Sequence, residues 1–207
     1  MPGLIGKKLG MTQIFTEDGK AVGCTVLEVG PCPVVQVKTS TTDGYEAIQL
    51  GFGAQRERRV AKPEAGHAAR AGLDHAPKVL AEFEFDEGQE YEAGQSLTVD
   101  LFEVGQKVKI TGLTKGRGFQ GTVKRHGFGG SRASHGGSSV LRKPGSIGPG
   151  TDPSRVINGR KMSGQMGGTQ RTAMNRRIYM IDAEKNLMLV RGSVPGARHN
   201  VVLIRSA

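Results

Sequence analysis

The sequence has no tryptophan and few aromatic residues of any kind. Only 5% of its 207 residues are aromatic, whereas glycine accounts for 32 residues. Large aromatic side chains often dominate cores and line small-molecule pockets. We therefore expect a modest core and extended chain that fits closely against another molecule, and no aromatic-lined substrate pocket.

Cysteine is scarce, and long apolar runs are absent. Cys24 and Cys32 are the two cysteines. Their spacing leaves a disulfide open, but we favour free, half-buried thiols because the N-terminus has no apolar segment typical of a signal peptide. No segment approaches the roughly 18 consecutive apolar residues of a membrane helix. The sequence therefore predicts a cytoplasmic protein without membrane contact.

Acidic residues are almost missing from the middle of the chain. Residues 1–103 hold 10 Lys/Arg and 16 Asp/Glu, whereas residues 104–181 hold 15 Lys/Arg and one acid, Asp152. Half of the glycines, 16 of 32, lie in residues 112–168. A solvated basic linker is one interpretation. We favour nucleic-acid contact because each Lys or Arg can replace a counterion of a phosphate, and glycine allows close backbone approach.

Alternating apolar and polar residues predict strands on both sides of this basic stretch. Asp18–Gly19 predicts a tight turn between the first two strands, and a second Asp-Gly pair separates the next two. Ala-rich residues 63–73 predict a short helix or two. The expected strands are 11–15, 21–29, 33–39, 45–52, 96–102, 106–114, two within 176–194, and 200–205, and residues 81–94 form a further, acidic strand-like piece.

These elements predict a mainly β fold, in which a closed or nearly closed barrel carries one long excursion. We assign 1–53, 97–114 and 176–207 to the barrel, 54–96 to a small α/β insertion, and 115–175 to an extended, Gly/Arg-rich RNA-penetrating loop. A loop of this length is unusual in a compact domain. It becomes reasonable if the loop folds only against RNA.

One motif in the basic stretch imitates a nucleotide-binding loop. Residues 116–123 fit G-x-G-x-x-G-x-V, a pattern that covers phosphates in kinases and, in shorter form, opens dinucleotide-binding helices. However, residues 123–131 are too glycine-rich for a helix, and no acid follows about 20 positions on. We interpret these glycines as backbone laid along phosphates.

Catalytic and metal sites are equally poorly supported. His126, His135 and Asp152 lie near serines, but no G-x-S-x-G motif surrounds any serine. Cys24 and Cys32 have no second pair of ligands at zinc spacing. We therefore expect no enzyme, metal or cofactor, and interpret the two histidines as hydrogen-bonding or stacking groups.

The apolar residues of the basic stretch leave two interpretations open. Phe119 and Phe128 either stack on bases or anchor the root of the loop to the barrel. Met162 and Met166 either enter an RNA crevice or pack at the base of the loop.

Five sequence blocks resemble the bacterial large-subunit ribosomal protein three family. They are GLIGKKLGMTQIF (3–15), GLTKGRGFQGTVKRHGFGG (112–130), GSIG (145–148), GRKMSGQMGG (159–168) and LMLVRGSVPG (187–196). The resemblance spans almost the whole chain. It implies a translation-protein-type β-barrel and an extension towards the peptidyl-transferase centre. It also implies binding near the 3′ end of the large rRNA, a role in nucleating assembly, and ribosomal proteins fourteen and nineteen as neighbours.

The resemblance further implies a set of rRNA-binding residues. Those in the basic stretch are Lys115, Arg117, Lys124, Arg125, His126, Arg132, His135, Arg142, Lys143, Ser146, Arg155, Arg160 and Lys161; the others are Lys7, Lys8 and Arg171. Two departures matter. Residues 149–152 stand where some relatives carry glutamines, one of them methylated, so we do not expect that modification. Residues 167–177 lack the usual acidic, valine-rich pattern, which leaves the pairing of the following strand open.

Two functions of other classes stay open. A nucleic-acid chaperone acting away from the ribosome would bind many RNAs with little preference. An RNA-modifying enzyme would need a cofactor site and acid/base residues, neither of which the sequence indicates.

Overall fold

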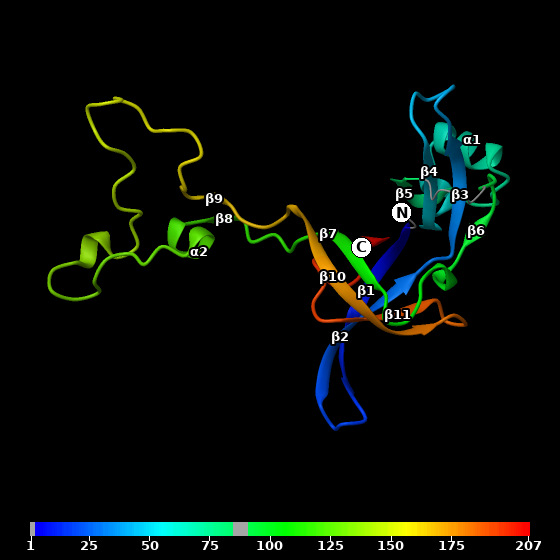
Figure 1. Ribbon diagram of the computed structural model, residues 1–207. Helices are drawn as coiled ribbons and strands as arrows, with labels where there is room; N and C mark the ends of the chain where they lie inside the picture. The colour runs from blue at the N-terminus through cyan, green and yellow to red at the C-terminus, as the bar shows by residue number, and fades with distance from the viewer. Residues whose placement is uncertain (1–2, 85–90) are drawn as a thin grey trace. The chain divides into compact units, whose positions relative to one another are not determined.

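The computed structural model describes residues 3–84 and 91–207, and its regular structure is mainly β-strand, as predicted (Figure 1). The chain divides into two compact units. One runs up to Leu113 and resumes at Gln170; we name it the barrel unit. The other, residues 114–169, we name the basic unit.

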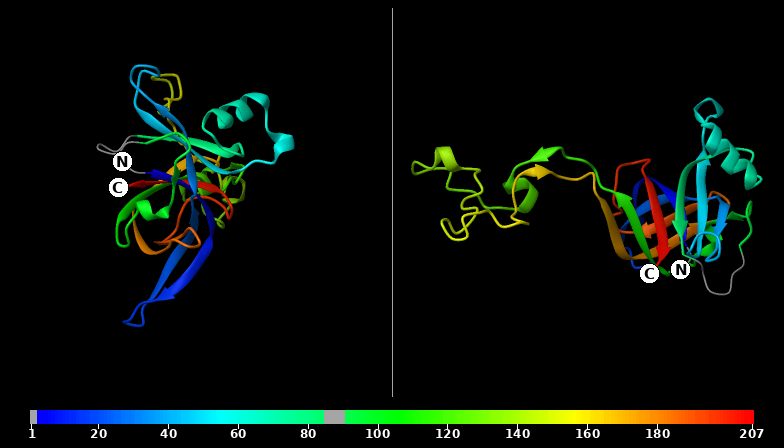
Figure 2. Two further views of the ribbon diagram at one scale, coloured as in Figure 1. Left: turned by 90° about the vertical axis from the view of Figure 1, so that its right-hand side faces the viewer. Right: turned by 90° about the horizontal axis from the view of Figure 1, so that it is seen from above.

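Six strands of the barrel unit close into a barrel (Figure 2). Around it they follow the order β1-β12-β7-β10-β11-β2, and neighbouring strands are antiparallel. The strands are β1 (Gly3–Phe15), β2 (Ala21–Val29), β7 (Lys107–Leu113), β10 (Gln170–Asp182), β11 (Leu187–Arg191) and β12 (Val201–Ser206). Because β1 and β12 pair, the two ends of the chain lie side by side in the barrel.

The predicted first hairpin is confirmed. Strands β1 and β2 pair from Phe15 and Ala21 down to Gly6 and Val29. Gly19 adopts a φ of 73°, which favours glycine, and the Thr16 N–H donates to the Lys20 carbonyl at 3.0 Å. A shift of register between Lys8 and Gly10 interrupts the ladder.

The barrel unit also contains a four-stranded sheet of order β5-β4-β3-β6. It contains β3 (Cys32–Lys38), β4 (Ala47–Ala54), β5 (Pro77–Phe83) and β6 (Ser96–Leu97). The expected barrel segment 1–53 therefore differs from the structure, since β3 and β4 leave the barrel. Alternation predicts a strand but not its partners, and here β3 pairs with β4 and β6. The expected helix is present as α1 (Lys62–Arg70), preceded by the 3-10 turn η1 (Glu57–Arg59).

Several predicted element boundaries were wrong. Strand β1 begins at Gly3 rather than at residue 11. The acidic strand-like piece expected at 81–94 corresponds to β5, which begins at Pro77 and ends at Phe83, and residues 85–90 of that prediction lie outside the described residues. Only Ser96–Leu97 of the expected strand 96–102 is extended, and a 3-10 turn, η2 (Val99–Leu101), follows it. The Thr98 hydroxyl donates to the Asp100 carboxylate at 2.8 Å, a local bond that favours a turn over a strand. Strand β10 begins at Gln170, so residues 170–175 belong to the barrel rather than to the loop, with Ala173 opposite Ile110.

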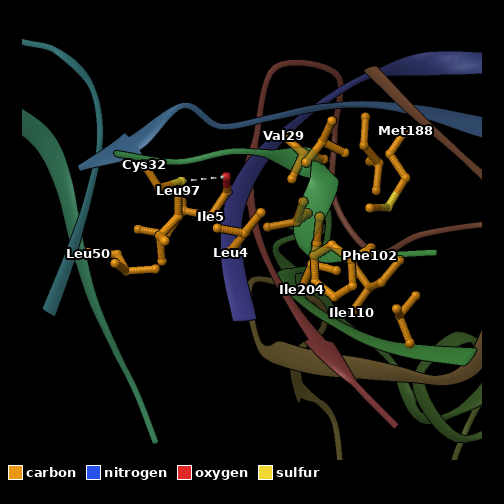
Figure 3. Packing of buried hydrophobic residues seen from close by; sticks show 14 of the residues in the cluster. Leu4, Ile5, Val29, Cys32, Leu50, Leu97, Phe102, Ile110, Met188 and Ile204 are labelled. Carbon is orange, nitrogen blue, oxygen red and sulfur yellow. Dashed lines mark hydrogen bonds between the residues drawn. The ribbon is translucent and has the colours of Figure 1, made fainter. Parts of the chain in front are cut away.

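Buried apolar residues of both sheets form one core in the barrel unit (Figure 3). Leu4 and Ile5 of β1 pack in the same cluster as Leu50 of β4. Cys24 and Cys32 are free, as favoured, but fully buried rather than half-buried. Burial raises the pKa of the Cys32 thiol to about 11, so it stays protonated and donates to the Ile5 carbonyl at 3.3 Å.

Candidate nucleic-acid interface

The basic unit carries ten Lys/Arg and one acid, Asp152. Among its described side chains, no cation pairs with an acid within 4.0 Å. The barrel unit behaves differently: Lys38 lies 2.6 Å from Glu82, and Lys7 lies 3.4 Å from Glu28. The positive charge of the basic unit is therefore not neutralised from within.

A short ladder holds together the two ends of the basic unit. Strand β8 (Phe119–Gln120) pairs with β9 (Gly164–Gln165), and the Arg117 N–H donates to the Met166 carbonyl at 2.8 Å. Gly167 has a φ of 70°, and a Cβ there would collide with the Lys115 carbonyl oxygen. Glycine at this position lets two basic segments, distant in sequence, approach backbone to backbone.

A short helix follows β8, where the sequence was expected to be too glycine-rich for one. Helix α2 (Thr122–His126) ends at the point where the dense glycines begin. Its last two side chains contact the opposite segment: Arg125 Nη1 lies 2.7 Å from the Met162 carbonyl oxygen, and His126 Nε2 lies 3.0 Å from it. Both side chains, predicted as rRNA contacts, thus also hold the fold of the unit and are only partly exposed.

The other predicted residues of the basic unit are exposed. They are Lys115, Arg117, Lys124, Arg132, His135, Arg142, Lys143, Ser146, Arg155, Arg160 and Lys161. Of these, Ser146, Arg160 and Lys161 line one hollow together with Phe128. Sequence reasoning did not single out Pro144 and Ile147, which also line it. An isolated apolar residue within a basic, glycine-rich run is the signal that could have found them.

The three predicted contacts of the barrel unit differ from one another. Arg171 is exposed on β10, opposite Gly112. Lys7 is partly exposed and paired with Glu28. Lys8 is only 8% exposed, and its ammonium group donates to the carbonyls of Val194 at 2.7 Å and Gly196 at 3.2 Å. Lys8 therefore ties β1 to the segment before β12 and does not present its charge to a partner.

The residues considered for catalysis or metal binding are not brought together by any described bond. His126 contacts a backbone carbonyl, while His135 and Asp152 are exposed. Within residues 3–84 and 91–207, no three His, Cys, Asp or Glu side chains gather as metal ligands would. In the same ranges, no helix is long and apolar enough to cross a membrane.

Comparison with known proteins decides the family. A family model described as ribosomal protein L3 matches residues 76–187, a range that contains the whole basic unit. The large ribosomal subunit protein uL3 of Cupriavidus taiwanensis is 50% identical over 207 residues, which cover 99% of this chain and 95% of the relative. The chain belongs to the ribosomal protein L3 family.

Other members of the L3 family are similarly close. The uL3 protein of Alkalilimnicola ehrlichii is 51% identical over 207 residues, covering 99% of this chain and 94% of the relative. That of Syntrophus aciditrophicus is 50% identical over 204 residues, covering 99% and 93%. Both units of the chain thus fall within the similarity, and membership of the L3 family makes this chain a ribosomal protein with its place in the cytoplasmic ribosome.

Proposed function

We propose that this L3-family chain is a structural protein of the large ribosomal subunit and binds its rRNA mainly through the basic unit. One observation carries the proposal. The basic unit has ten Lys/Arg but a single acid, and its described side chains form no ion pair. Such a surface repels itself in water. Beside RNA, each cation releases a counterion from a phosphate, which stabilises the complex.

The mechanism that we propose is positional and involves no chemical step on a substrate. Arg and Lys neutralise phosphates where RNA helices converge, and glycines admit backbone where side chains would not fit. Phosphate contacts fix register and orientation without reading sequence. The affinity should therefore fall steeply with salt, by about 0.7 to 0.9 logarithmic units per logarithmic unit of salt for each phosphate neutralised.

The proposed contacts are the predicted residues of the basic unit together with Lys7 and Arg171. We omit Lys8 because its ammonium group is held by the carbonyls of Val194 and Gly196. Arg125 and His126 are included with a double role, since each also contacts the Met162 carbonyl.

The place of the chain in the subunit is the finer part of the proposal. We propose binding near the 3′ end of the large rRNA, help in nucleating assembly, and a basic unit directed towards the peptidyl-transferase centre. Ribosomal proteins fourteen and nineteen are the proposed neighbours, and the barrel is proposed to be of the translation-protein type. The resemblance of the five sequence blocks supports these points. The relatives, which are named as large ribosomal subunit proteins, support the assignment to the large subunit.

Ultraviolet crosslinking in cells, followed by sequencing of the attached RNA, tests this function. We expect crosslinks concentrated near the 3′ end of large-subunit rRNA, with peptides of residues 114–169 as the attached protein segment. Crosslinks spread over messenger and other RNAs would contradict the proposal and favour an RNA chaperone. A second experiment tests the alternative of an RNA-modifying enzyme. The purified protein is incubated with RNA and a nucleotide or a methyl donor, and modification of the RNA would favour the enzyme.

A further inference from the structure

A hollow in the basic unit combines an apolar wall with a basic rim. Its volume is about 390 Å³, and its lining includes Phe128, Pro144, Ser146, Ile147, Arg160 and Lys161. Three separate segments contribute these residues: the end of the α2 region, residues 144–147 and residues 159–161. A volume of this size lies within the range of about 300 to 1,000 Å³ that is typical of sites for small organic groups.

The apolar wall does not belong to a protein core. None of the buried core residues among the described part of the chain comes from 114–169. Phe128 is half-buried, its ring centroid lies 6.0 Å from that of His126, and Ile147 is 43% exposed. Apolar groups held open to solvent in so basic a unit favour an occupant with a flat apolar face.

The rim specifies the charge of the occupant. Arg160 and Lys161 are exposed, and no acidic side chain lines the hollow. Arg160 Nη2 lies 3.4 Å from the Ser146 carbonyl oxygen, a long contact that leaves the other guanidinium donors for an anion. A planar guanidinium beside an ammonium group matches a phosphate.

We infer that this hollow receives a single unstacked nucleotide of the rRNA. Its base lies against Phe128, Pro144 and Ile147, and its phosphate contacts Arg160 and Lys161. Sequence-specific recognition of RNA largely uses such unstacked bases, which stack on aromatic side chains. The inference rests on the proposed function and adds to it one specific base contact among many phosphate contacts.

The test compares two phenylalanines of the same unit in the full-length protein. Phe128→Leu keeps the wall apolar but removes its aromatic face, whereas Phe128→Tyr retains that face. Phe119→Leu is the matched control, because Phe119 is 74% exposed on β8 and does not line the hollow. Each protein is bound to a transcript of the 3′-terminal part of large-subunit rRNA, irradiated, digested and searched by mass spectrometry for nucleotide adducts. Affinity is measured on the same samples by filter binding.

We expect a nucleotide adduct on Phe128 that is lost in Phe128→Leu and retained in Phe128→Tyr and Phe119→Leu. Affinity should fall roughly tenfold in Phe128→Leu, since base stacking on one aromatic ring is of that order. An unchanged thermal transition shows that Phe128→Leu is folded. The inference is wrong, while the proposed function stands, if the wild-type protein binds the transcript tightly without an adduct on Phe128 and Phe128→Leu binds the transcript equally well. That outcome would leave the hollow to a side chain of a neighbouring protein. If no variant or wild type prefers the rRNA transcript over unrelated RNA, the proposed function itself fails.

Discussion

The barrel unit and the basic unit differ in where their side chains find partners. In the barrel unit, apolar residues of two sheets share one core, and Lys7 and Lys38 pair with carboxylates. In the basic unit, Thr122 is the only described residue that is buried, and its described cations form no ion pair with an acid. Burial of apolar surface is the main favourable term that offsets the entropy of ordering a chain. The barrel unit is therefore stabilised by its own core, whereas the described residues of the basic unit bury too little apolar surface for this, as we expect of a segment that orders against a partner.

Of the changes that we predict, removal of residues 127–160 should have the largest effect, because it takes away much of the basic unit and leaves the barrel unit intact. The deletion takes out five Lys/Arg and one acid. Because His126 Nε2 lies 3.0 Å from the Met162 carbonyl oxygen, a short Gly-Ser linker can close the gap. We expect the salt slope of rRNA binding to become shallower by roughly 3.5 to 4.5, and the thermal transition of the barrel to persist. Loss of that cooperative transition would show that the loop belongs to the core.

A pair of isoleucine variants compares the two units in stability. Ile110 of β7 is fully buried, whereas Ile157 of the basic unit is 60% exposed. Ile110→Ala should lower the free energy of unfolding by about 2 to 5 kcal/mol. Ile157→Ala should change it by no more than about 0.5 kcal/mol. Denaturant unfolding followed by circular dichroism measures both, and equal costs would mean that the basic unit has a core of its own.

Two matched pairs of arginines compare the units in binding. Replacement of Arg117 and Arg125 by Ala should weaken binding to several unrelated RNA sequences alike and reduce the salt slope by roughly 1.4 to 1.8. Replacement of Arg58 and Arg59, exposed in η1 of the barrel unit, removes the same charge and should change the slope little.

Arg125 needs a further control because it also holds the Met162 carbonyl. Arg125→Lys keeps the charge but not the geometry of that bond. Binding by Arg125→Lys close to wild type would assign the loss to phosphate contact. A loss confined to one RNA sequence in the double variant would instead indicate base readout and contradict the prediction.

The sequence predicted local structure better than it predicted partners. The Asp18–Gly19 hairpin was correct because the turn and its flanking strands are neighbours in the chain. Strands β3 and β4 were predicted as strands but wrongly assigned to the barrel. The alternation of apolar and polar residues indicates a strand but not the sheet to which that strand belongs. The early start of β10 was missed because apolar and polar residues do not alternate in 171–175, although Thr172 pairs with Thr111 and their hydroxyls lie 2.9 Å apart.

The candidate site shows the same limit. Charge and glycine content were sufficient to locate the basic unit, because both are summed over a long segment. They did not distinguish Lys7 from Lys8, because the carbonyls of Val194 and Gly196 that hold the Lys8 ammonium group lie far along the chain. Nor could they show that Phe128, Ser146 and Lys161 line one hollow, since this depends on the path of the chain between them.

The smallest expected effect concerns the ion pair between Lys38 and Glu82 in the barrel unit. Glu82 lies 2.6 Å from Lys38 Nζ and accepts a hydrogen bond from the Tyr45 hydroxyl at 2.9 Å. The hydrogen bond from Lys38, and then that from Tyr45, hold the pKa of the Glu82 carboxyl below its usual value. A carboxyl whose pKa is lowered by folding contributes stability above its unfolded pKa and loses that contribution as the pH falls through the folded pKa. We therefore expect Glu82→Gln to have a slightly lower melting temperature than the wild type near pH 7.

This difference should narrow as the pH falls below about 4.3, the ordinary pKa of glutamate, and disappear once the wild-type carboxyl is protonated. Melting temperatures of both proteins over an acidic pH series measure it, and Glu84→Gln serves as a control of the same chemistry. Because the pair is partly exposed, salt should also reduce the difference. A gap between wild type and Glu82→Gln that stays constant down to the lowest pH would mean that Glu82 acts through packing rather than charge. The Lys38–Glu82 pair would then add no charge-dependent stability to the barrel unit, although it neutralises the cation.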